Sequence, residues 1–473
     1  MRPTRRRWIL AGMLLIAAML AGCRREQQPD VTDEQAAEVD SQLQEKYGKS
    51  LDELPEVTLV IISPHPDMVE KEFTRAFMLD YALAAGKRAR LQWRNIGGGT
   101  GKIVEHLMNV YQRAETSEMD IVWGGGEYEF GRMARAGILA PMDIPADYKD
   151  NVPATFNGLP FWDDQNSLWA GSAVSGFGIL YNKTLLERYN ITPPGRWEEM
   201  GDKRFNDLLA LADPTQSGSA AATYEMIVQS GGNWPDGWAR LLGILGNVSK
   251  FYDGASDAAN AVIAEAPVAT CIDFYGTERV ENHPDDLVYI SPAGQTAFGA
   301  DPIGILKNPP HPELAQAFVD FVLSARGQAL WALSVGTEAG PAKRALGRQP
   351  IRRDFYTQPL EGTLPYIVNF YEQGKAMAID ADIRATRFNV LRMLIKAAAI
   401  DNLSGLQAAK DRLIATGFDA ELKAVFDELP PDVRTMEQVA EANRKLRDAT
   451  EREKLVTGWS QFFRDKYDRI RAD

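Results

Sequence analysis

Two glycine-rich stretches contain the residues of this chain that are best placed to do chemistry. The first, NIGGGTGK at 95–102, has the Gly-Lys pair of the loop that binds phosphate in nucleotide hydrolases. That loop has the pattern G-x-x-x-x-G-K-[ST], but Ile96 stands in place of its first glycine and Ile103 in place of its hydroxyl residue. Only Gly101 and Lys102 fit the pattern. The stretch is therefore not predicted to bind a nucleotide with magnesium.

The pattern of strands and helices around these stretches indicates what else they could bind. The continuous apolar run VTLVIIS at 57–63 predicts a strand that is buried on both faces, and an amphipathic helix follows it. The order of strand, loop and helix then repeats at ARLQWR (89–94) and at MDIVW (119–123). This order predicts the α/β fold class with a parallel sheet.

The loops after parallel strands lie at the carboxyl edge of a sheet, where open α/β folds bind ligands. We expect three such loops to converge on one cleft through His65, Gly98, Gly99, Thr100, Trp123, Gly124, Gly125 and Glu127. Glycine lets backbone N–H groups approach a ligand, and a helix that begins at Thr100 would favour an anion. Alternatively, the glycines only make tight turns, and His65 is a rigid turn residue between two prolines. Trp123 would then belong to the core, and Glu127 would be a solvated first-turn acid.

A second α/β block is expected after residue 170. Strands are predicted in SGFGILYN (175–182), LLALADP (208–214) and APVATCIDFYGTERV (266–280), and a polar turn with a helix in TQSGSAAATYEMIVQSGG (215–232). The candidate ligand contacts of this block are Ser175, Ser217, Gly218, Ser219, Asp273 and Tyr275. The serines at the helix start would donate to an anion or only cap the helix. Tyr275 would contact the ligand or only complete the core.

The N-terminal segment forms a separate unit. Arg5, Arg6 and Arg7, the apolar WILAGMLLIAAML and the small residues before Cys23 are typical of a secretory signal over residues 1–22. The order LAGC resembles a bacterial lipobox, which would imply cleavage before Cys23 and its acylation. A transmembrane anchor is the alternative, but the apolar run is short for a bilayer span. Residues 23–56 are expected to form a tether, and the lipid would be the only membrane attachment.

Composition excludes several classes of function. The 473 residues carry a net charge of −13, which argues against nucleic acid or an anionic membrane surface as a partner. Cys271 is the only other cysteine, so a lipidated Cys23 leaves no internal disulfide and no thiolate metal cluster. The chain has no HExxH, no CxxC and no nucleophile elbow. We therefore expect no enzyme activity and no cofactor.

A series of motifs occurs in a characteristic order: LAGC, SPHPDMVEKEFTRAF, DIVWGGG, GFGILYNKTLL with RWEEM, ADPTQSGS and HPELAQAFVDFVLSARGQALW. Through them, residues 57–340 resemble the extracellular solute-binding proteins of bacterial ABC importers, in the branch of ferric-iron-binding and phosphonate-binding lipoproteins. The resemblance implies two α/β lobes joined by hinge strands. Lobe 1 would comprise 57–170 with a return at 290–340, lobe 2 would comprise 171–289, and a helical C-terminal region at 341–473 would pack on the lobes.

The resemblance also implies a function. Such a lipoprotein works on the periplasmic or extracellular face, captures a small ligand between its lobes and delivers it to an ABC permease. Ferric-binding members hold the metal by a histidine, a carboxylate and paired tyrosines, and here His65, Glu127 and Tyr275 stand at or near those places. Phe274 replaces the second tyrosine, and Fe(III) favours anionic oxygen. We therefore expect an organic, phosphate- or phosphonate-bearing anion; ferric iron, or a sensor without a permease, is the alternative.

Overall fold

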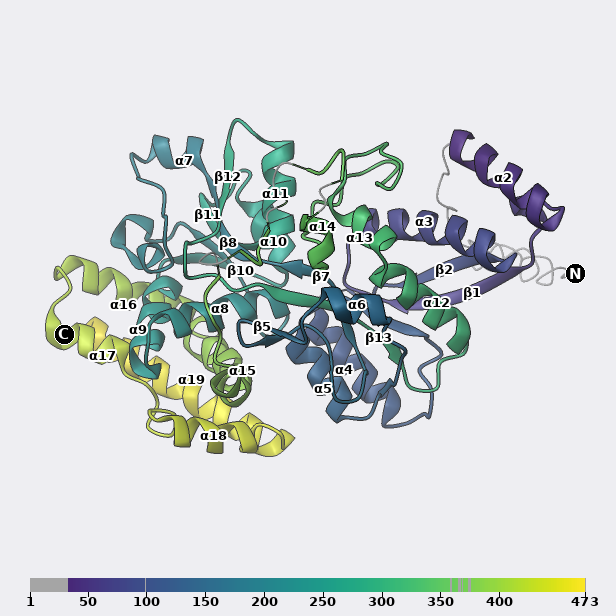
Figure 1. The fold of residues 1–473 in the computed structure, drawn as a ribbon. Coiled ribbons are helices and arrows are strands. Elements are labelled where there is room, and N and C mark those ends of the chain that lie inside the picture. Colours follow the sequence, from purple (N-terminus) through teal and green to yellow (C-terminus); the bar gives the residue numbers. More distant parts are fainter. Residues whose placement is uncertain are drawn as a thin grey trace, which may run out of the picture.

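Two β-sheets with helices packed against them form the two lobes of the protein (Figure 1). The computed structural model describes residues 33–97, 99–357, 360–364, 367, 369–372 and 376–472. The predicted signal peptide, Cys23 and Gly98 lie outside these residues, so the expectations for them remain predictions.

The sheet of lobe 1 has the strand order β2-β1-β3-β13-β4, and β7 also pairs with β13. Its first three strands run parallel and are β1 (Glu56–Ile62), β2 (Arg88–Arg94) and β3 (Ile121–Trp123). They are followed by α3 (Asp67–Ala85), α4 (Thr100–Tyr111) and α5 (Glu127–Arg135). In contrast, β13 (Gly299–Leu306) is antiparallel to β3, to β4 (Leu139–Ala140) and to β7 (Ala170–Ser175). The sheet is therefore mixed, which corrects the prediction of a parallel one, because β13 re-enters this lobe from the other.

The sheet of lobe 2 has the order β10-β9-β11-β8-β12. Its strands are β8 (Phe177–Asn182), β9 (Leu209–Ala212), β10 (Val248–Tyr252), β11 (Val268–Ile272) and β12 (Leu287–Ile290). The main helices are α8 (Gly218–Ser230), α9 (Trp234–Leu245), α10 (Ala255–Ala261) and α11 (Asp273–Asn282). Along β9, Leu209 and Leu211 pack into the cluster with α8 and α9, whereas Ala210 packs into the cluster with α10. The strand is buried on both faces, which explains its continuous apolar sequence.

Two crossover strands connect the lobes side by side. Gly176 is the single residue between β7 of lobe 1 and β8 of lobe 2. The return path from β12 to β13 lies against it, because the hydroxyl of Thr296 donates to the carbonyl of Phe177 at 2.6 Å. A Cβ built on Gly176 would lie 2.8 Å from the ring of Phe298, so no larger residue fits there without a shift. This narrow pair of strands forms the hinge.

The C-terminal region joins the core of lobe 2. Its helices are α15 (Ala381–Ile395), α16 (Leu403–Ala415), α17 (Ala420–Asp427), α18 (Met436–Lys445) and α19 (Ala449–Ala472). In Figure 1 these helices lie beside α8 and α9. The buried rings of Phe463 on α19 and Trp238 on α9 have centroids 5.8 Å apart, within one apolar cluster that also holds the side chains of β9. Helices α15 to α19 are thus part of the interior of lobe 2, whereas Leu346, Ile351 and Phe370 of the same region join the core of lobe 1.

The remaining helices complete lobe 1. The motif HPELAQAFVDFVLSARGQALW forms two helices, α12 (Pro312–Leu323) and α13 (Ala325–Ala332), because Ser324 ends the first helix and its hydroxyl accepts the N–H of Gly327 to cap the second. Near the N-terminus, α2 (Asp33–Tyr47) packs Leu43 against Met78 and Ala82 of α3. This part of the predicted tether is therefore docked on lobe 1.

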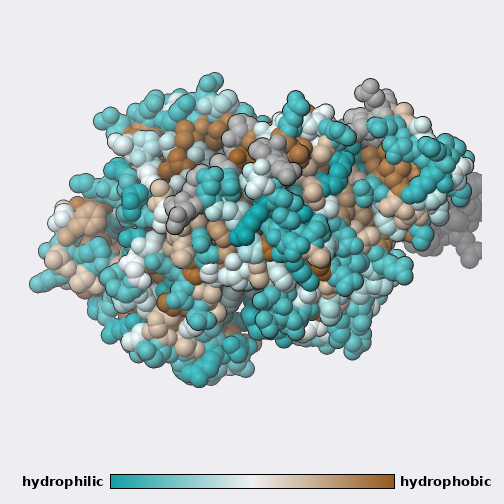
Figure 2. Space-filling view, in the orientation of Figure 1, coloured by the Kyte–Doolittle hydropathy of each residue, from teal (hydrophilic) through white to brown (hydrophobic). Residues whose placement is uncertain are grey.

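None of the helices within residues 33–472 that the structure describes is both long and apolar enough to cross a membrane. The face of the molecule in Figure 2 is largely hydrophilic, and its apolar residues show only in scattered patches.

The shared core makes a prediction for the C-terminal region. Phe463→Ala should lower the free energy of unfolding of the whole of lobe 2 by about 3–5 kcal/mol, because it leaves a cavity beside Trp238. Phe462→Ala, at the half-buried neighbouring position, should cost less than half as much. Urea unfolding followed by tryptophan fluorescence measures both; equal losses, or a separate early transition for the C-terminal helices, would contradict the shared core.

Candidate ligand-binding site

A cavity of about 390 Å³ lies between the lobes and takes its walls from both of them. Ten of the predicted site residues line it: His65, Gly99, Thr100, Gly125, Glu127, Ser175, Ser217, Gly218, Ser219 and Tyr275. The lining also contains charged residues that no sequence motif predicts, among them Asp301, Arg348 and Arg384. The cleft is thus formed by the loops after the strands, by the crossover strands and by the C-terminal region.

Three predicted residues among those that the structure describes do not line this cavity. Trp123 is fully buried in lobe 1, where its indole N–H donates to Ser172 Oγ at 2.7 Å, so it is a core residue and not a cleft wall. Gly124 has a φ of +102°, a conformation that glycine adopts readily, and its backbone lies close to the ring of His65. Asp273 accepts the N–H groups of Gly176 and Phe274, and its burial raises its pKa to about 6. It holds the hinge.

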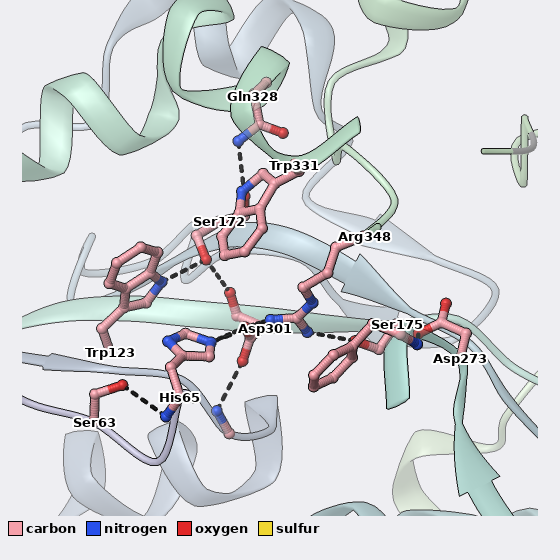
Figure 3. Close-up of polar contacts among 12 residues, drawn as sticks. Ser63, His65, Trp123, Ser172, Ser175, Asp273, Asp301, Gln328, Trp331 and Arg348 are labelled. Atoms are coloured by element: carbon pink, nitrogen blue, oxygen red, sulfur yellow. Dashed lines mark hydrogen bonds and ion pairs between the residues drawn. The ribbon is translucent and has the colours of Figure 1, made fainter. Parts of the chain in front are cut away.

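The floor of the cleft is a buried ionic cluster centred on Asp301 (Figure 3). Asp301 Oδ1 accepts the N–H of Gly125 at 2.8 Å, and Oδ2 contacts His65 Nε2 at 2.8 Å and the guanidinium of Arg348. Burial alone would raise the pKa of this carboxyl, but the charge of Arg348 and the contact with His65 hold it well below its usual range. Asp301 is therefore a fixed buried anion.

Arg348 connects this cluster to the crossover strand β7 and to an aromatic ring of lobe 2. Its Nη2 donates to Ser175 Oγ of β7 at 2.6 Å. The guanidinium lies 4.3 Å from the ring centroid of Phe274 on α11 and 5.2 Å from that of Trp331 on α13. Arg348 is enclosed between a ring of each lobe, so its charge is held next to the cavity with little freedom of movement.

Several helices begin at the wall of the cavity, among them α4, α5 and α8. The N-cap residues are Gly99 for α4 and Gly126 for α5 in lobe 1, and Ser217 for α8 in lobe 2. Neither Gly99 nor Gly126 supplies a side-chain cap. Ser217 Oγ accepts the N–H of Ala220 at 3.3 Å and lies 3.1 Å from Ser219 Oγ, so these serines do cap their helix. The positive ends of three helices favour a negatively charged ligand in this cavity.

The predicted ferric ligands are engaged in other contacts. His65 Nε2 contacts Asp301 and lies 3.1 Å from Arg348 Nη1, while Glu127 forms an ion pair with Arg384. Burial raises the pKa of Tyr275 to about 12, which favours a neutral phenol. Among the residues that the structure describes, no group of three or more His, Cys, Asp or Glu side chains is arranged to hold a metal ion. The geometry suits an anion better than a hard cation.

Comparisons with known proteins agree with this architecture. Residues 119–352 match the sequence profile of the family described as bacterial extracellular solute-binding protein. The phosphoglycerate transport regulatory protein PgtC of Salmonella typhimurium is 32% identical over 161 residues, which make up 34% of this chain and 40% of that protein. The match therefore spans less than half the length of this curated relative.

Similar solved structures include binding proteins for different ligands. The periplasmic binding protein AfuA from Actinobacillus pleuropneumoniae, with exogenous fructose-6-phosphate bound, has a TM-score of 0.56 and 17% identity, and the match covers 69% of this chain and 93% of AfuA. Iron-bound HitA from Pseudomonas aeruginosa has a TM-score of 0.53 and 18% identity, with 71% and 98% covered. At these identities the likeness shows the fold, and it confirms the predicted two-lobe architecture.

The ionic cluster makes a prediction about stability. Asp301→Asn leaves Arg348 buried without its carboxylate and should lower the free energy of unfolding by about 3–5 kcal/mol near neutral pH. A carboxyl whose folded pKa is depressed contributes fully above its unfolded pKa of 3.8 and loses that contribution as the pH falls below it. The gap between wild type and variant in urea unfolding should therefore narrow below about pH 4. A gap of unchanged size at about pH 2.5 would contradict this role.

The contact between the lobes makes a second prediction. A Cβ built on Gly99 would lie 2.3 Å from the carbonyl oxygen of Gln216 in lobe 2. Gly99→Ala should therefore keep the lobes apart, and the radius of gyration from solution scattering should exceed that of wild type. Gly218→Ala is the matched control, since its Cβ would lie 3.9 Å from Thr100 in ordinary contact. Superimposable scattering curves for both variants and wild type would show that Gly99 does not limit closure.

Proposed function

We propose that this protein, whose residues 119–352 match the profile of the bacterial extracellular solute-binding proteins, is the receptor of an ABC importer for a small phosphorylated organic anion. Proteins of this family bind small ligands and deliver them to permeases outside the cytoplasm. The receptor closes on its ligand by bending the two crossover strands at Gly176, and the closed form docks on the permease. Acylation at Cys23 would hold it at the membrane.

One observation carries the choice of an anion. The N-termini of α4, α5 and α8 meet at a cavity of about 390 Å³, together with the guanidinium groups of Arg348 and Arg384. Most acidic side chains of the wall are already neutralised, since Glu127, Glu129, Glu225 and Asp301 each form an ion pair with an arginine. The helix ends therefore give the cavity a positive potential, and few unpaired carboxylates of the protein remain to balance it.

The names of relatives support a phosphate group on the ligand. PgtC is named for phosphoglycerate transport, and AfuA was solved with fructose-6-phosphate. Ferric iron, as in HitA, has less support in this chain because Phe274 has no oxygen and His65 is bound to Asp301. The word "regulatory" in the name of PgtC favours one second candidate, in which the closed receptor signals to a partner instead of feeding a permease.

The proposal is tested by titrating the purified protein with 3-phosphoglycerate, fructose 6-phosphate and ferric citrate in a calorimeter. We expect a phosphorylated probe to bind with a dissociation constant of about 10 μM or tighter, equivalent to about −7 kcal/mol. The recovered probe should be chemically unchanged, and solution scattering of the complex should give a smaller radius of gyration. An iron-dependent visible absorption band without binding of either phosphate would establish the ferric alternative instead.

A further inference from the structure

Helix α15 belongs to the C-terminal region, yet it reaches both lobes at the cleft. Three of its arginines form buried ion pairs: Arg384 with Glu127, Arg387 with Glu225, and Arg392 with Glu129. Glu127 and Glu129 lie on α5 of lobe 1, whereas Glu225 lies on α8 of lobe 2. The helix therefore lies along the wall of the ligand cavity and is ion-paired with both lobes.

Two of the three arginines are engaged in structural contacts. Arg387 donates from Nε and Nη2 to the carboxylate of Glu225 at 3.2 and 2.5 Å. Arg392 donates from its three nitrogens to Pro214 O, Glu129 Oε1 and Thr215 O at 2.8, 2.9 and 3.1 Å. Neither side chain lines the cavity. Both arginines fix the position of α15.

Arg384 differs from them in three respects. It lines the cavity, as do Glu127 and Phe388, whose ring centroid lies 5.0 Å from its guanidinium carbon. Its side chain is nine-tenths buried, and among the described residues its guanidinium has one polar partner, an oxygen of Glu127. Its burial lowers its pKa to about 10, so it remains charged at neutral pH. A buried guanidinium with donors left over beside a cavity is equipped to bind a further anion.

Glu127 occupies the place where such an anion would bind. It is the first residue of α5, so its carboxylate lies at the positive end of a helix as well as against Arg384. The N-terminal end of α5 in lobe 1 and the guanidinium of Arg384 in the C-terminal region are both groups that suit a phosphate. The protein thus fills part of its own anion site with a carboxylate.

We propose that Arg384 is a ligand-binding residue supplied by the C-terminal region, and that Glu127 is its internal counter-ion, which a phosphate group of the ligand displaces. This inference rests on the proposed function. A phosphate carries nearly two negative charges and three acceptor oxygens, so it can accept two N–H groups of one guanidinium and also contact a helix N-terminus. A ligand whose only anionic group is a carboxylate would exchange the carboxylate of Glu127 for an equivalent one, so the exchange would contribute little to its binding free energy. The displaced group therefore selects for phosphate over carboxylate.

The experiment compares Arg384→Gln and Glu127→Gln by titration with 3-phosphoglycerate, or with fructose 6-phosphate if that is the probe that wild type binds. Loss of the guanidinium should weaken binding at least tenfold. Loss of the competing carboxylate should tighten binding about threefold or more. The two partners of one ion pair thus change the affinity in opposite directions, which a purely structural ion pair cannot do.

Three further measurements complete the design. The double variant Arg387→Gln with Glu225→Gln removes a buried ion pair of the same helix without leaving a free carboxylate at the cavity wall, and its affinity should stay within about threefold of wild type. Arg384→Lys keeps the charge and should retain part of the affinity, so it replaces the glutamine variant if that one does not fold. Glycerate, which lacks the phosphate, should bind wild type at least tenfold more weakly than 3-phosphoglycerate.

The outcomes separate the two proposals. Wild-type protein that binds neither phosphorylated probe overturns the proposed function. Wild-type protein that binds one of them, with Arg384→Gln and Glu127→Gln both weakened or both unchanged, overturns only the role of Arg384 and Glu127. An equal loss of affinity in Arg384→Gln and in the double variant Arg387→Gln with Glu225→Gln also overturns it, since the effect would then be one of helix position.

Discussion

The buried pairing of Arg348 with Asp301 is the constraint on which the cleft depends. Both side chains are almost fully inaccessible to solvent, so either charge alone would carry a large desolvation cost. Asp301 is approached by the backbone of the loop after β3 and by the histidine of the loop after β1. Three segments that are distant in sequence are therefore held around one carboxylate, and the edge of lobe 1 is preformed before any ligand arrives.

The C-terminal region changes how a two-lobe receptor can move. The crossover strands alone would leave the lobes free to separate, because these strands link the lobes only at Gly176 and its neighbours. Arg392 adds a connection on the far side of the cavity, since it contacts Glu129 of lobe 1 and the backbone at Pro214 and Thr215 of lobe 2. Opening must break or rearrange this contact, so the balance between open and closed forms depends on α15 as well as on the ligand.

Periodic patterns predicted the fold well, and single long-range contacts could not be predicted. The runs VTLVIIS and LLALADP are strands because side chains on both faces are covered, and that condition is visible locally. Asp301, Arg348 and Arg384 stand in no recognisable motif, and their partners lie 47 to 283 positions away. Trp123 was assigned to the cleft because it ends a strand, but its indole points into the core toward Ser172. The glycine loop at 97–101 was predicted as a ligand contact; the structure adds that Gly99 lets the lobes approach.

The shared interior of lobe 2 and the C-terminal helices has a consequence for how the chain is made. The first sheet lacks its central strand until β13 at 299–306 has been synthesised, and the second lobe lacks part of its core until α19 at 449–472 is present. Neither half can bury its apolar surface until these segments are present, so cooperative folding requires both β13 and α19. A chain that lacks α19 would expose leucine and tryptophan side chains along α9, which makes it a substrate for quality-control proteases.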